Sequence, residues 1–285
     1  MNYDLLEKER VAIERLRAFA PSDGYYLAYS GGKDSDTVKI LASLADVKYD
    51  AVHNLTTVDM PETIQYIRSQ PDVTIHRAMD DAGKHITMWN LIVRKGIPPL
   101  RHMRYCCSEL KETGGKGRVT VTGVRWAESL RRKASWDVVA VIGKPKSTQK
   151  LAEELGVDYQ LSLQGALILN DDNDLNRRMV EHCFRTRKTL VNPIVDWTDE
   201  DVWTFLRHYG CESNPLYGCG YKRIGCIGCP MARKAQRLEE FSRYPTYKAA
   251  YLRAFDKMLK RRKESGRPAT IWTNSEEVFQ WWITG

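Results

Sequence analysis

Hydrophobic positions alternate between strand-like runs and helical faces through the first half of the chain. Short apolar or alternating runs predict strands at residues 25–28, 49–55, 73–76 and 118–123. Apolar residues at helical spacing predict helices at residues 5–20, from residue 37 onward, at 62–70 and at 87–95. Strands that alternate with helices predict an α/β fold, in which a parallel sheet is covered by helices on both faces.

Proline, glycine and threonine mark several element boundaries. Pro61 suits the first turn of the helix at 62–70, and Gly96 ends the helix at 87–95. Thr198 is expected to cap a helix that runs to Tyr209.

The second half of the chain has weaker patterning. Residues 134–164 are interpreted as an insertion with one helix around 148–155, residues 174–182 as helical, and 189–193 as an edge strand. Beyond Pro230 the chain is expected to be helical and basic, with the aromatic residues near its end used for packing. We therefore expect a nucleotide-binding α/β domain at residues 1–210, followed by a cysteine-containing segment and a mainly helical region at 211–285.

Composition favours a soluble globular protein with an anionic partner. The chain has 285 residues, of which 42% are hydrophobic and 28% charged. No apolar run is long enough for a membrane span, and residues 1–17 are charged, so we expect a cytoplasmic protein without a membrane partner. The net charge of +8 favours a nucleotide or a nucleic acid, and charge alone does not separate the two.

A glycine turn between the first strand and the next helix is the first candidate site. In Ser30-Gly31-Gly32-Lys33-Asp34-Ser35, the glycines let the backbone approach a ligand closely, and the N–H groups of the new helix attract an oxyanion. Ser30 and Ser35 add hydroxyl donors, and Lys33 adds a positive charge. The segment lacks the spacing of a Walker A loop, yet it still predicts a phosphate site.

Cysteines form the second candidate site. The chain has seven, namely Cys106, Cys107, Cys183, Cys211, Cys219, Cys226 and Cys229. An odd number with one CxxC pair indicates metal or redox chemistry in a cytoplasmic protein. Two cysteine pairs supply the four thiolates of a zinc or a [4Fe–4S] site, and the adjacent Cys106-Cys107 pair argues against structural zinc. Cys183, Cys211 and Cys219 are interpreted as ordinary buried or surface cysteines.

These motifs resemble a known family. The glycine turn resembles the SGGxDS signature of PP-loop ATP pyrophosphatases. The order of motifs is similar to that of the phosphoadenosine phosphosulfate (PAPS) reductase family, which includes adenosine 5′-phosphosulfate (APS) reductases and DNA phosphorothioation proteins. The matching segments are residues 30–35, 57–63, 104–111, 123–129, 192–203 and 214–230. The resemblance implies an adenine nucleotide alpha hydrolase-like fold and a [4Fe–4S] cluster held by Cys106, Cys107, Cys226 and Cys229.

The resemblance also implies roles for charged residues. Arg125 and Glu128 are similar to the family's G-x-R-x-x-E-S segment, which faces the nucleotide's anionic end, and Arg131 and Arg132 follow it. Arg131, Arg132 and Lys133 could equally form a solvated face. The predicted catalytic residues are Lys33, Asp34, Arg125 and Glu128, and the predicted nucleotide-binding residues are Ser30, Gly31, Gly32, Lys33, Asp34, Ser35, Asp59, Arg125 and Arg131.

Further candidates complete the predicted site. Asp34 and Asp59 are expected to hold Mg²⁺ on the phosphates, although Asp34 could instead complement the helix dipole. Lys111 and Arg223 are weaker candidates for contact with the anion. Sulfonucleotide reductases resemble one another in a C-terminal Glu-Cys-Gly-Leu-His tail that supplies the attacking thiol, whereas this sequence ends in Gln-Trp-Trp-Ile-Thr-Gly. We therefore expect no thiosulfonate intermediate at the usual place.

Three functions follow as hypotheses. The first is a PP-loop enzyme that cleaves ATP to AMP and pyrophosphate and so activates an acceptor for sulfur transfer, with a cysteine desulfurase as donor and DNA or tRNA as acceptor. The second is an APS or PAPS reductase that uses another thiol, such as Cys219 or a partner's. The third is a non-catalytic protein that senses a nucleotide or the cluster. The oligomeric state stays open.

Overall fold

The computed structural model describes residues 3–128, 133, 137–142, 153, 160–161, 167–169, 188–266 and 271–284. The chain is organised in two compact units. The first unit comprises Met1–His53, Gln65–Ile75 and Gly115–Arg223, and the second comprises Asn54–Ile64, His76–Gly114 and Ile224–Gly285. The sequence predicts a single boundary at residue 210. In the structure, the second unit also contains two segments from the first half of the chain.

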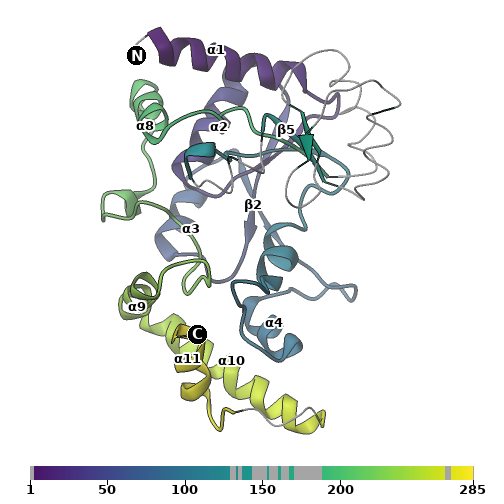
Figure 1. The fold of residues 1–285 in the computed structure, drawn as a ribbon, viewed down its shortest axis with the longest axis vertical. Coiled ribbons are helices and arrows are strands. Elements are labelled where there is room, and N and C mark those ends of the chain that lie inside the picture. The colour runs from purple at the N-terminus through teal and green to yellow at the C-terminus, as the bar shows by residue number, and fades with distance from the viewer. Residues whose placement is uncertain are drawn as a thin grey trace. The chain divides into compact units, whose positions relative to one another are not determined.

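The sheet has the strand order β3-β2-β1-β4-β8-β5-β7-β6 in the described part of the chain (Figure 1). The strands are β1 (Tyr25–Ala28), β2 (Tyr49–Leu55), β3 (Val73–Arg77), β4 (Val119–Val121), β5 (Val139–Ile142), β6 (Gln160–Leu161), β7 (Leu167–Leu169) and β8 (Lys188–Val191). β1 runs parallel to β2 and β4, and Leu27 lies opposite Ala51 and Val121 in these two pairings. This half confirms the predicted parallel α/β sheet.

The other half of the sheet differs from the prediction. β5 runs antiparallel to both β8 and β7, and β6 runs antiparallel to β7. β8 is therefore an interior strand, and its prediction as an edge strand is wrong, because β5 from the supposed insertion pairs with it. The helices expected around residues 148–155 and 174–182 lie outside the described residues, apart from residue 153.

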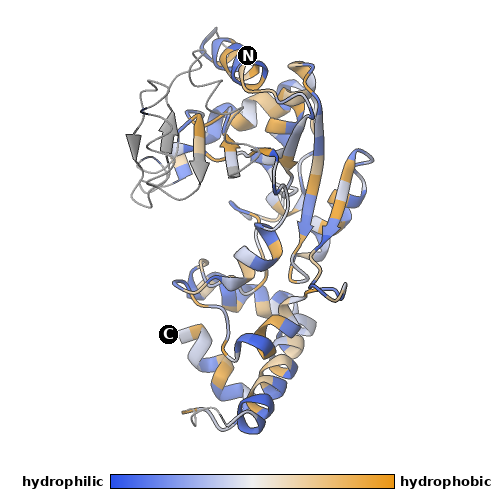
Figure 2. Ribbon diagram, turned by 90° about the vertical axis from the view of Figure 1, so that its right-hand side faces the viewer, coloured by the Kyte–Doolittle hydropathy of each residue, from blue (hydrophilic) through white to orange (hydrophobic). Residues whose placement is uncertain are grey.

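Helices of the first unit pack on the apolar core of the sheet. They are α1 (Tyr3–Ala18), α2 (Lys33–Leu44) and α8 (Asp199–His208). Buried Leu16, Val38 and Phe205 belong to one core cluster with strand residues such as Leu27. α1 carries both hydrophobic and hydrophilic stretches, as expected for a helix with one buried face (Figure 2). α3 (Pro61–Arg68) begins at its proline, as predicted.

The second unit is mainly helical, as predicted for the end of the chain. Its helices are α4 (Met88–Lys95), α9 (Lys234–Arg243), α10 (Pro245–Glu264) and α11 (Ser275–Thr284), and a π-helical turn η1 covers Cys107–Lys111. Its core is aromatic: the Tyr251 and Trp282 ring centroids are 4.8 Å apart, and the Phe241 and Phe279 centroids 5.1 Å apart. None of the helices in the described ranges combines the length and apolar character that a membrane span requires.

Candidate functional site

The glycine turn lies between β1 and α2 in the first unit. Gly31 has a φ of 72°, a left-handed conformation that glycine adopts without strain. A Cβ on Gly32 would lie 3.2 Å from the Tyr217 hydroxyl oxygen. Both glycines are therefore needed locally, one for the turn and one for the close approach of a side chain.

Ser35 fixes the turn through two hydrogen bonds. The Gly32 N–H donates to Ser35 Oγ at 3.1 Å, and Ser35 Oγ donates to the Gly32 carbonyl at 2.7 Å. Ser30 Oγ donates to Ser35 Oγ at 3.2 Å. The two predicted serines thus hold the loop at the N-terminus of a 12-residue helix, where the helix dipole favours an anion.

A second segment, which contains Asn214 and Tyr217, contacts this loop through two hydrogen bonds. The Lys33 N–H donates to the Tyr217 hydroxyl at 2.9 Å, and Asn214 Nδ2 donates to the Gly31 carbonyl at 3.0 Å. Sequence reasoning included both residues in a matching segment and gave neither a role. An amide and a phenol in that segment indicate possible hydrogen-bonding groups. Their positions in the sequence do not show which loop they contact.

Four charged side chains form a network at the start of α2. Lys33 is 6% exposed, and its Nζ lies 3.3 Å from Asp34 Oδ2 and 3.4 Å from Asp199 Oδ1. Arg125 is 1% exposed, and it contacts the same two carboxylates, with Nε 2.7 Å from Asp34 Oδ1 and Nη2 2.5 Å from Asp199 Oδ1. A third nitrogen of Arg125 donates to the Trp197 carbonyl at 3.2 Å.

The network shifts the pKa values of two of its groups. Burial lowers the pKa of Arg125, but Asp34 and Asp199 outweigh it and raise that pKa above its ordinary value. Burial raises the pKa of Asp199, whereas Arg125 and Lys33 outweigh it and lower that pKa. Two cations and two carboxylates balance, so an incoming phosphate would have to compete with Asp199, a residue that sequence reasoning missed.

Arg125 therefore pairs with two carboxylates of its own unit, and the nucleotide contact that the resemblance implies stays a prediction. The backbone before Arg125 also packs tightly against Asp34, because a Cβ on Gly123 would lie 2.8 Å from Asp34 Cβ. Glu128 accepts the Arg125 N–H at 3.4 Å and lies 3.8 Å from Arg223 Nη2. Glu128 and Arg223 thus belong to the same unit as the glycine turn.

Three further basic residues follow Glu128 in this segment. Arg131 and Arg132 lie outside the described residues, and Lys133 is exposed.

The predicted cysteine ligands lie together in the second unit. One pocket has an empty volume of about 370 Å³, including open solvent at its mouth. Its lining consists of Thr56, Met88, Pro99, Cys106, Cys107, Lys111, Cys226, Ile227, Gly228, Cys229, Pro230 and Tyr251. The adjacent cysteines occupy the start of η1, and the CxxC pair lies on the loop before α9.

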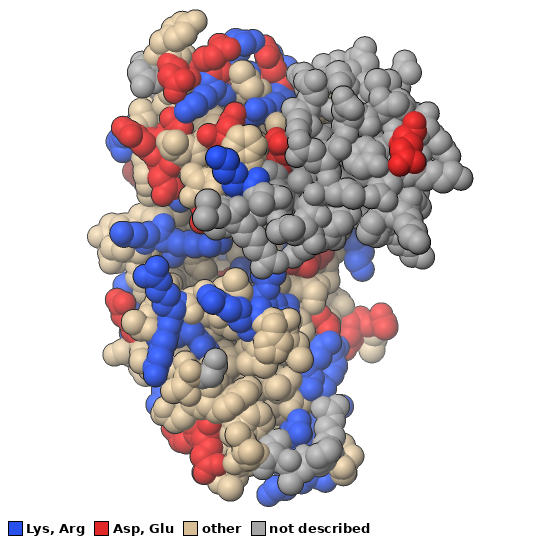
Figure 3. Space-filling view, in the orientation of Figure 1, with Lys and Arg blue, Asp and Glu red and all other residues tan. Residues whose placement is uncertain are grey.

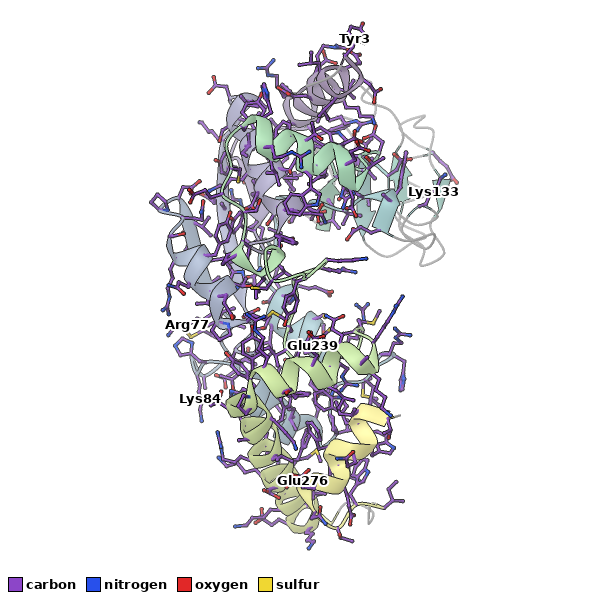
Figure 4. The ribbon with its side chains drawn as sticks, turned by 90° about the vertical axis from the view of Figure 1, so that its left-hand side faces the viewer. Tyr3, Arg77, Lys84, Lys133, Glu239 and Glu276 are labelled. Atoms are coloured by element: carbon purple, nitrogen blue, oxygen red, sulfur yellow. The ribbon has the colours of Figure 1, made fainter. Side chains whose placement is uncertain are left out.

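The CxxC loop is fixed by its neighbours. The Ile227 N–H donates to the Val58 carbonyl at 2.8 Å, and Cys226 Sγ donates to Thr56 Oγ1 at 3.5 Å. The Gly228 N–H donates to Glu240 Oε2 at 2.8 Å. Glu240 belongs to α9, the helix on which Glu239 is labelled in Figure 4. Three hydrogen bonds therefore fix the conformation of this loop.

Asp59 shapes the turn beside this loop. Its carboxylate accepts the Thr56 N–H at 2.7 Å, and its backbone forms a bridge with Cys226. Thr57 has a φ of 66°, which is strained for a β-branched residue, and its hydroxyl accepts the Met88 N–H at 3.0 Å. Asp59 belongs to the second unit and Asp34 to the first, so their joint magnesium site stays a prediction.

Three of the four thiols have shifted pKa values. A hydrogen bond from Cys106 outweighs burial and lowers the pKa of Cys107 to about 6, with help from Lys111 and Arg104. The same bond raises the pKa of Cys106, and burial raises that of Cys226 to about 11, although Lys111 opposes the shift. The pocket thus combines one thiol with a lowered pKa and two with raised pKa values, and a bound cation would favour ionisation of those two.

The donor set suits an iron–sulfur cluster, because four soft thiol ligands line one pocket. Among the residues that the structure describes, no three His, Cys, Asp or Glu side chains converge closely enough to hold a single metal ion. Cys211 packs against the core of the first unit, Cys219 is exposed, and Cys183 lies outside the described residues.

Among known proteins, two relatives match most of this chain and a third matches a short stretch. The chain is 29% identical to an uncharacterized 37.8 kDa protein of Escherichia phage 186, over 80% of this chain and 73% of that protein. It is 25% identical to an uncharacterized protein of Methanocaldococcus jannaschii, over 85% of this chain and only 53% of that protein. A 42-residue stretch, 15% of this chain and 16% of the relative, is 45% identical to the adenosine 5′-phosphosulfate reductase of Allochromatium vinosum.

Solved structures and a family model complete the comparison. The PAPS reductase of Candida auris aligns with a TM-score of 0.44 and 13% identity, over 79% of this chain and 96% of that one. The model of the phosphoadenosine phosphosulfate reductase domain matches residues 24–232, a range that contains both the glycine turn and all four pocket cysteines. Because this match covers well over half of its length, the chain belongs to the phosphoadenosine phosphosulfate reductase family.

Proposed function

We propose that the protein binds ATP at the loop formed by Ser30 to Ser35 and cleaves it to AMP and pyrophosphate, which activates an acceptor for sulfur transfer. One observation carries the proposal: the buried Lys33 lies at the N-terminus of α2 beside a left-handed Gly31 and two serine hydroxyls. Such a helix start stabilises negative charge, and the leaving pyrophosphate develops negative charge during the reaction.

The residues of the network would divide the work. The loop N–H groups and Lys33 would stabilise the pyrophosphate that leaves when an acceptor oxygen attacks the α-phosphate. Asp199 would yield its place beside Lys33 to the nucleotide, since its carboxylate is 72% exposed and can move away. Arg125 would keep Asp34 oriented through their 2.7 Å contact. Mg²⁺ bound with ATP would supply further neutralising charge, with Asp34 and Asp59 as its expected carboxylates.

The cysteine pocket supports the sulfur-transfer part of the proposal. Cys106, Cys107, Cys226 and Cys229 would hold a [4Fe–4S] cluster, which would supply a binding site for sulfur or brace the surrounding loops. A cysteine desulfurase is the proposed sulfur donor, and displacement of AMP by the transferred sulfur would complete the reaction.

A reductase is the second candidate, favoured by the exposed thiol of Cys219. In that case the nucleotide would be APS or PAPS, and the thiol would attack its sulfur, with AMP or adenosine 3′,5′-bisphosphate as the leaving group. A dithiol reductant would then attack the enzyme sulfur, release sulfite and end as a disulfide. A sensing protein without turnover is the third candidate, since the loop and the cysteine pocket would serve binding alone.

Two assays on anaerobically reconstituted protein distinguish the three candidates: labelled ATP together with DNA or tRNA as acceptor, and labelled APS together with a dithiol reductant. Pyrophosphate release that is lost in Lys33→Met supports the proposed ATP cleavage. Sulfite release that is lost in Cys219→Ser would replace it with the reductase. Binding of ATP without any product would leave the sensing role.

The cluster needs its own measurement. Absorbance near 400 nm and bound iron should be present in the wild type and in Cys219→Ser, and absent in Cys226→Ser. Equal iron content in both variants would contradict the predicted ligand set.

A further inference from the structure

Positive charge is unevenly divided between the two units. The second unit contains 19 Lys and Arg against 12 Asp and Glu, whereas the first contains 25 against 24. Nearly all of the net charge of +8 therefore belongs to the unit that carries the cysteine pocket. In the view of Figure 3, Lys and Arg side chains lie over the part of the surface that α4, α9 and α10 form.

Two loops of the second unit bring exposed cations and exposed methionines together beside the pocket. One loop is Arg101-His102-Met103-Arg104, directly before Cys106, and the other is Met231-Ala232-Arg233-Lys234, directly after Cys229 and Pro230. Arg101 Nη2 donates to the Met231 carbonyl at 3.3 Å, which joins the loops. Leu100 and Met103 exchange backbone hydrogen bonds at 3.2 and 3.0 Å, so the first loop is a defined turn. We call these two loops the rim.

The rim differs from a site for a small anion. Lys33, at the glycine turn, is 6% exposed, as expected for a cation that contacts a single phosphate group. The four rim cations, Arg101, Arg104, Arg233 and Lys234, are all exposed. Exposed cations on a surface suit an extended phosphodiester backbone, which they contact without reading its sequence.

The methionines add a second feature. Met103 and Met231 are 43% and 44% exposed, although each has a polarizable apolar side chain that is normally buried. Apolar side chains, methionine included, contact or wedge between bases in architectural nucleic-acid complexes. A surface of four cations with two methionines therefore matches phosphates and base faces together.

We propose that the rim binds the backbone of a nucleic acid and presents it to the cysteine pocket as the sulfur acceptor, an inference that rests on the proposed sulfur-transfer function. The flanking acidic residue Glu109 does not cancel this charge, because it is paired with Arg94 and Lys95 on α4. The rim leads directly into both pairs of cysteines, so a bound backbone lies next to the thiols.

Fluorescence anisotropy with labelled single-stranded DNA, duplex DNA and tRNA, over a series of salt concentrations, tests the rim. The quadruple variant Arg101→Gln, Arg104→Gln, Arg233→Gln and Lys234→Gln should bind at least tenfold more weakly at low salt. The slope of log affinity against log salt should fall by about 3–4, at roughly 0.9 for each lost contact with a duplex phosphate. The tightest of the three probes identifies the acceptor class.

A matched variant removes the same charge elsewhere in the second unit. Arg253, Lys257, Lys260 and Arg261 are exposed on α10, two of their neighbours being the acidic Asp256 and Glu264. Their replacement by Gln should leave affinity within about twofold of the wild type. Replacement of Arg101, Arg104 and Arg233 by Lys retains the rim charge and should largely retain binding, which separates loss of charge from loss of folding.

The outcomes are distinct from those of the proposed function. Equal loss in the rim and α10 variants, loss in the α10 variant alone, or no binding of any probe by the wild type would overturn the inference. ATP affinity should be unchanged in the rim variant, and iron content should be unchanged in the Lys variant, which retains a cation at position 104 beside Cys107. Failure to bind ATP with intact nucleic-acid binding would refute the proposed function and leave the rim in place.

Discussion

At the scale of single residues, the Arg125 guanidinium has the largest structural role in the first unit. It is 1% exposed and has two carboxylates and a carbonyl as partners, whereas the side chain of Arg223 is 72% exposed and lies 3.8 Å from Glu128. Removing one partner of a buried ion pair leaves the other partners uncompensated. The same residue type therefore has very different consequences at the two positions.

Arg125→Met should lower the free energy of unfolding by about 2–4 kcal/mol, because Asp34 and Asp199 lose their main cation. The control Arg223→Met should change it by less than about 0.5 kcal/mol, as is usual for an exposed pair. Urea denaturation measures both. Similar small effects of the two variants would show that the Arg125 network contributes little to stability.

Asp36 gives the first unit a pH-dependent stability. It is 2% exposed, and burial raises its pKa to about 6, although hydrogen bonds from Tyr29 and Tyr66 oppose the shift. Between the unfolded pKa near 4 and the folded pKa near 6, the folded state binds more protons, so stability falls as pH rises through this window. Above the folded pKa, the stability that this proton binding contributes is completely lost.

Asp36→Asn removes this titration and retains an acceptor for the Tyr29 hydroxyl. Its stability relative to the wild type should therefore rise between pH 4 and pH 7, by up to about 3 kcal/mol at roughly 1.4 kcal/mol per pKa unit. Thermal or urea unfolding at several pH values measures the difference. The exposed Asp23→Asn is the control, and a pH-independent difference for Asp36→Asn would contradict the expected linkage.

At the scale of elements, the CxxC loop depends on one glycine. Gly228 has a φ of 72°, and a Cβ there would lie 2.5 Å from Phe241 Cζ on α9. Gly225, three residues earlier, is exposed, and a Cβ there would meet nothing within 4 Å. The loop therefore offers a sensitive and an insensitive glycine in one segment.

Gly228→Ala should destabilise the second unit by about 2–4 kcal/mol, from left-handed strain and from the clash with the aromatic core. It should also reduce the iron bound on reconstitution, because the loop carries two predicted ligands. Gly225→Ala should behave like the wild type in both measurements. Normal iron content in Gly228→Ala would show that the loop tolerates another conformation.

At the scale of the whole molecule, a ligand that binds only the folded state stabilises it by mass action. Mg-ATP at 100 times its dissociation constant should raise the free energy of unfolding by about 2.7 kcal/mol. Lys33→Met should lose most of this stabilisation, and Lys116→Met, at an exposed turn residue, should retain it. Thermal unfolding with and without nucleotide measures the shift, and an equal shift in both variants would place the nucleotide away from the glycine turn.

Much of the fold follows from local pattern. The strands at 25–28 and 49–55, the first-turn Pro61 and the Thr198 cap of α8 lie where the sequence predicts them, since each depends on neighbours within a few residues. β5 and the interior position of β8 were missed, because strand order depends on pairing between segments almost 50 residues apart. The partners of Lys33 were missed for the same reason: Asp199 and Tyr217 lie more than 160 residues further along the chain.

By itself, the sequence determined the family, the glycine turn and the four pocket cysteines, because each is a short motif whose chemistry depends on residue type and close spacing. Only the tertiary structure decided that Arg125 is bound to Asp34 and Asp199, that Gly228 fits against Phe241, and that two basic loops meet beside the cysteines. Burial and partnership depend on which distant segments pack together, and no local pattern contains that information.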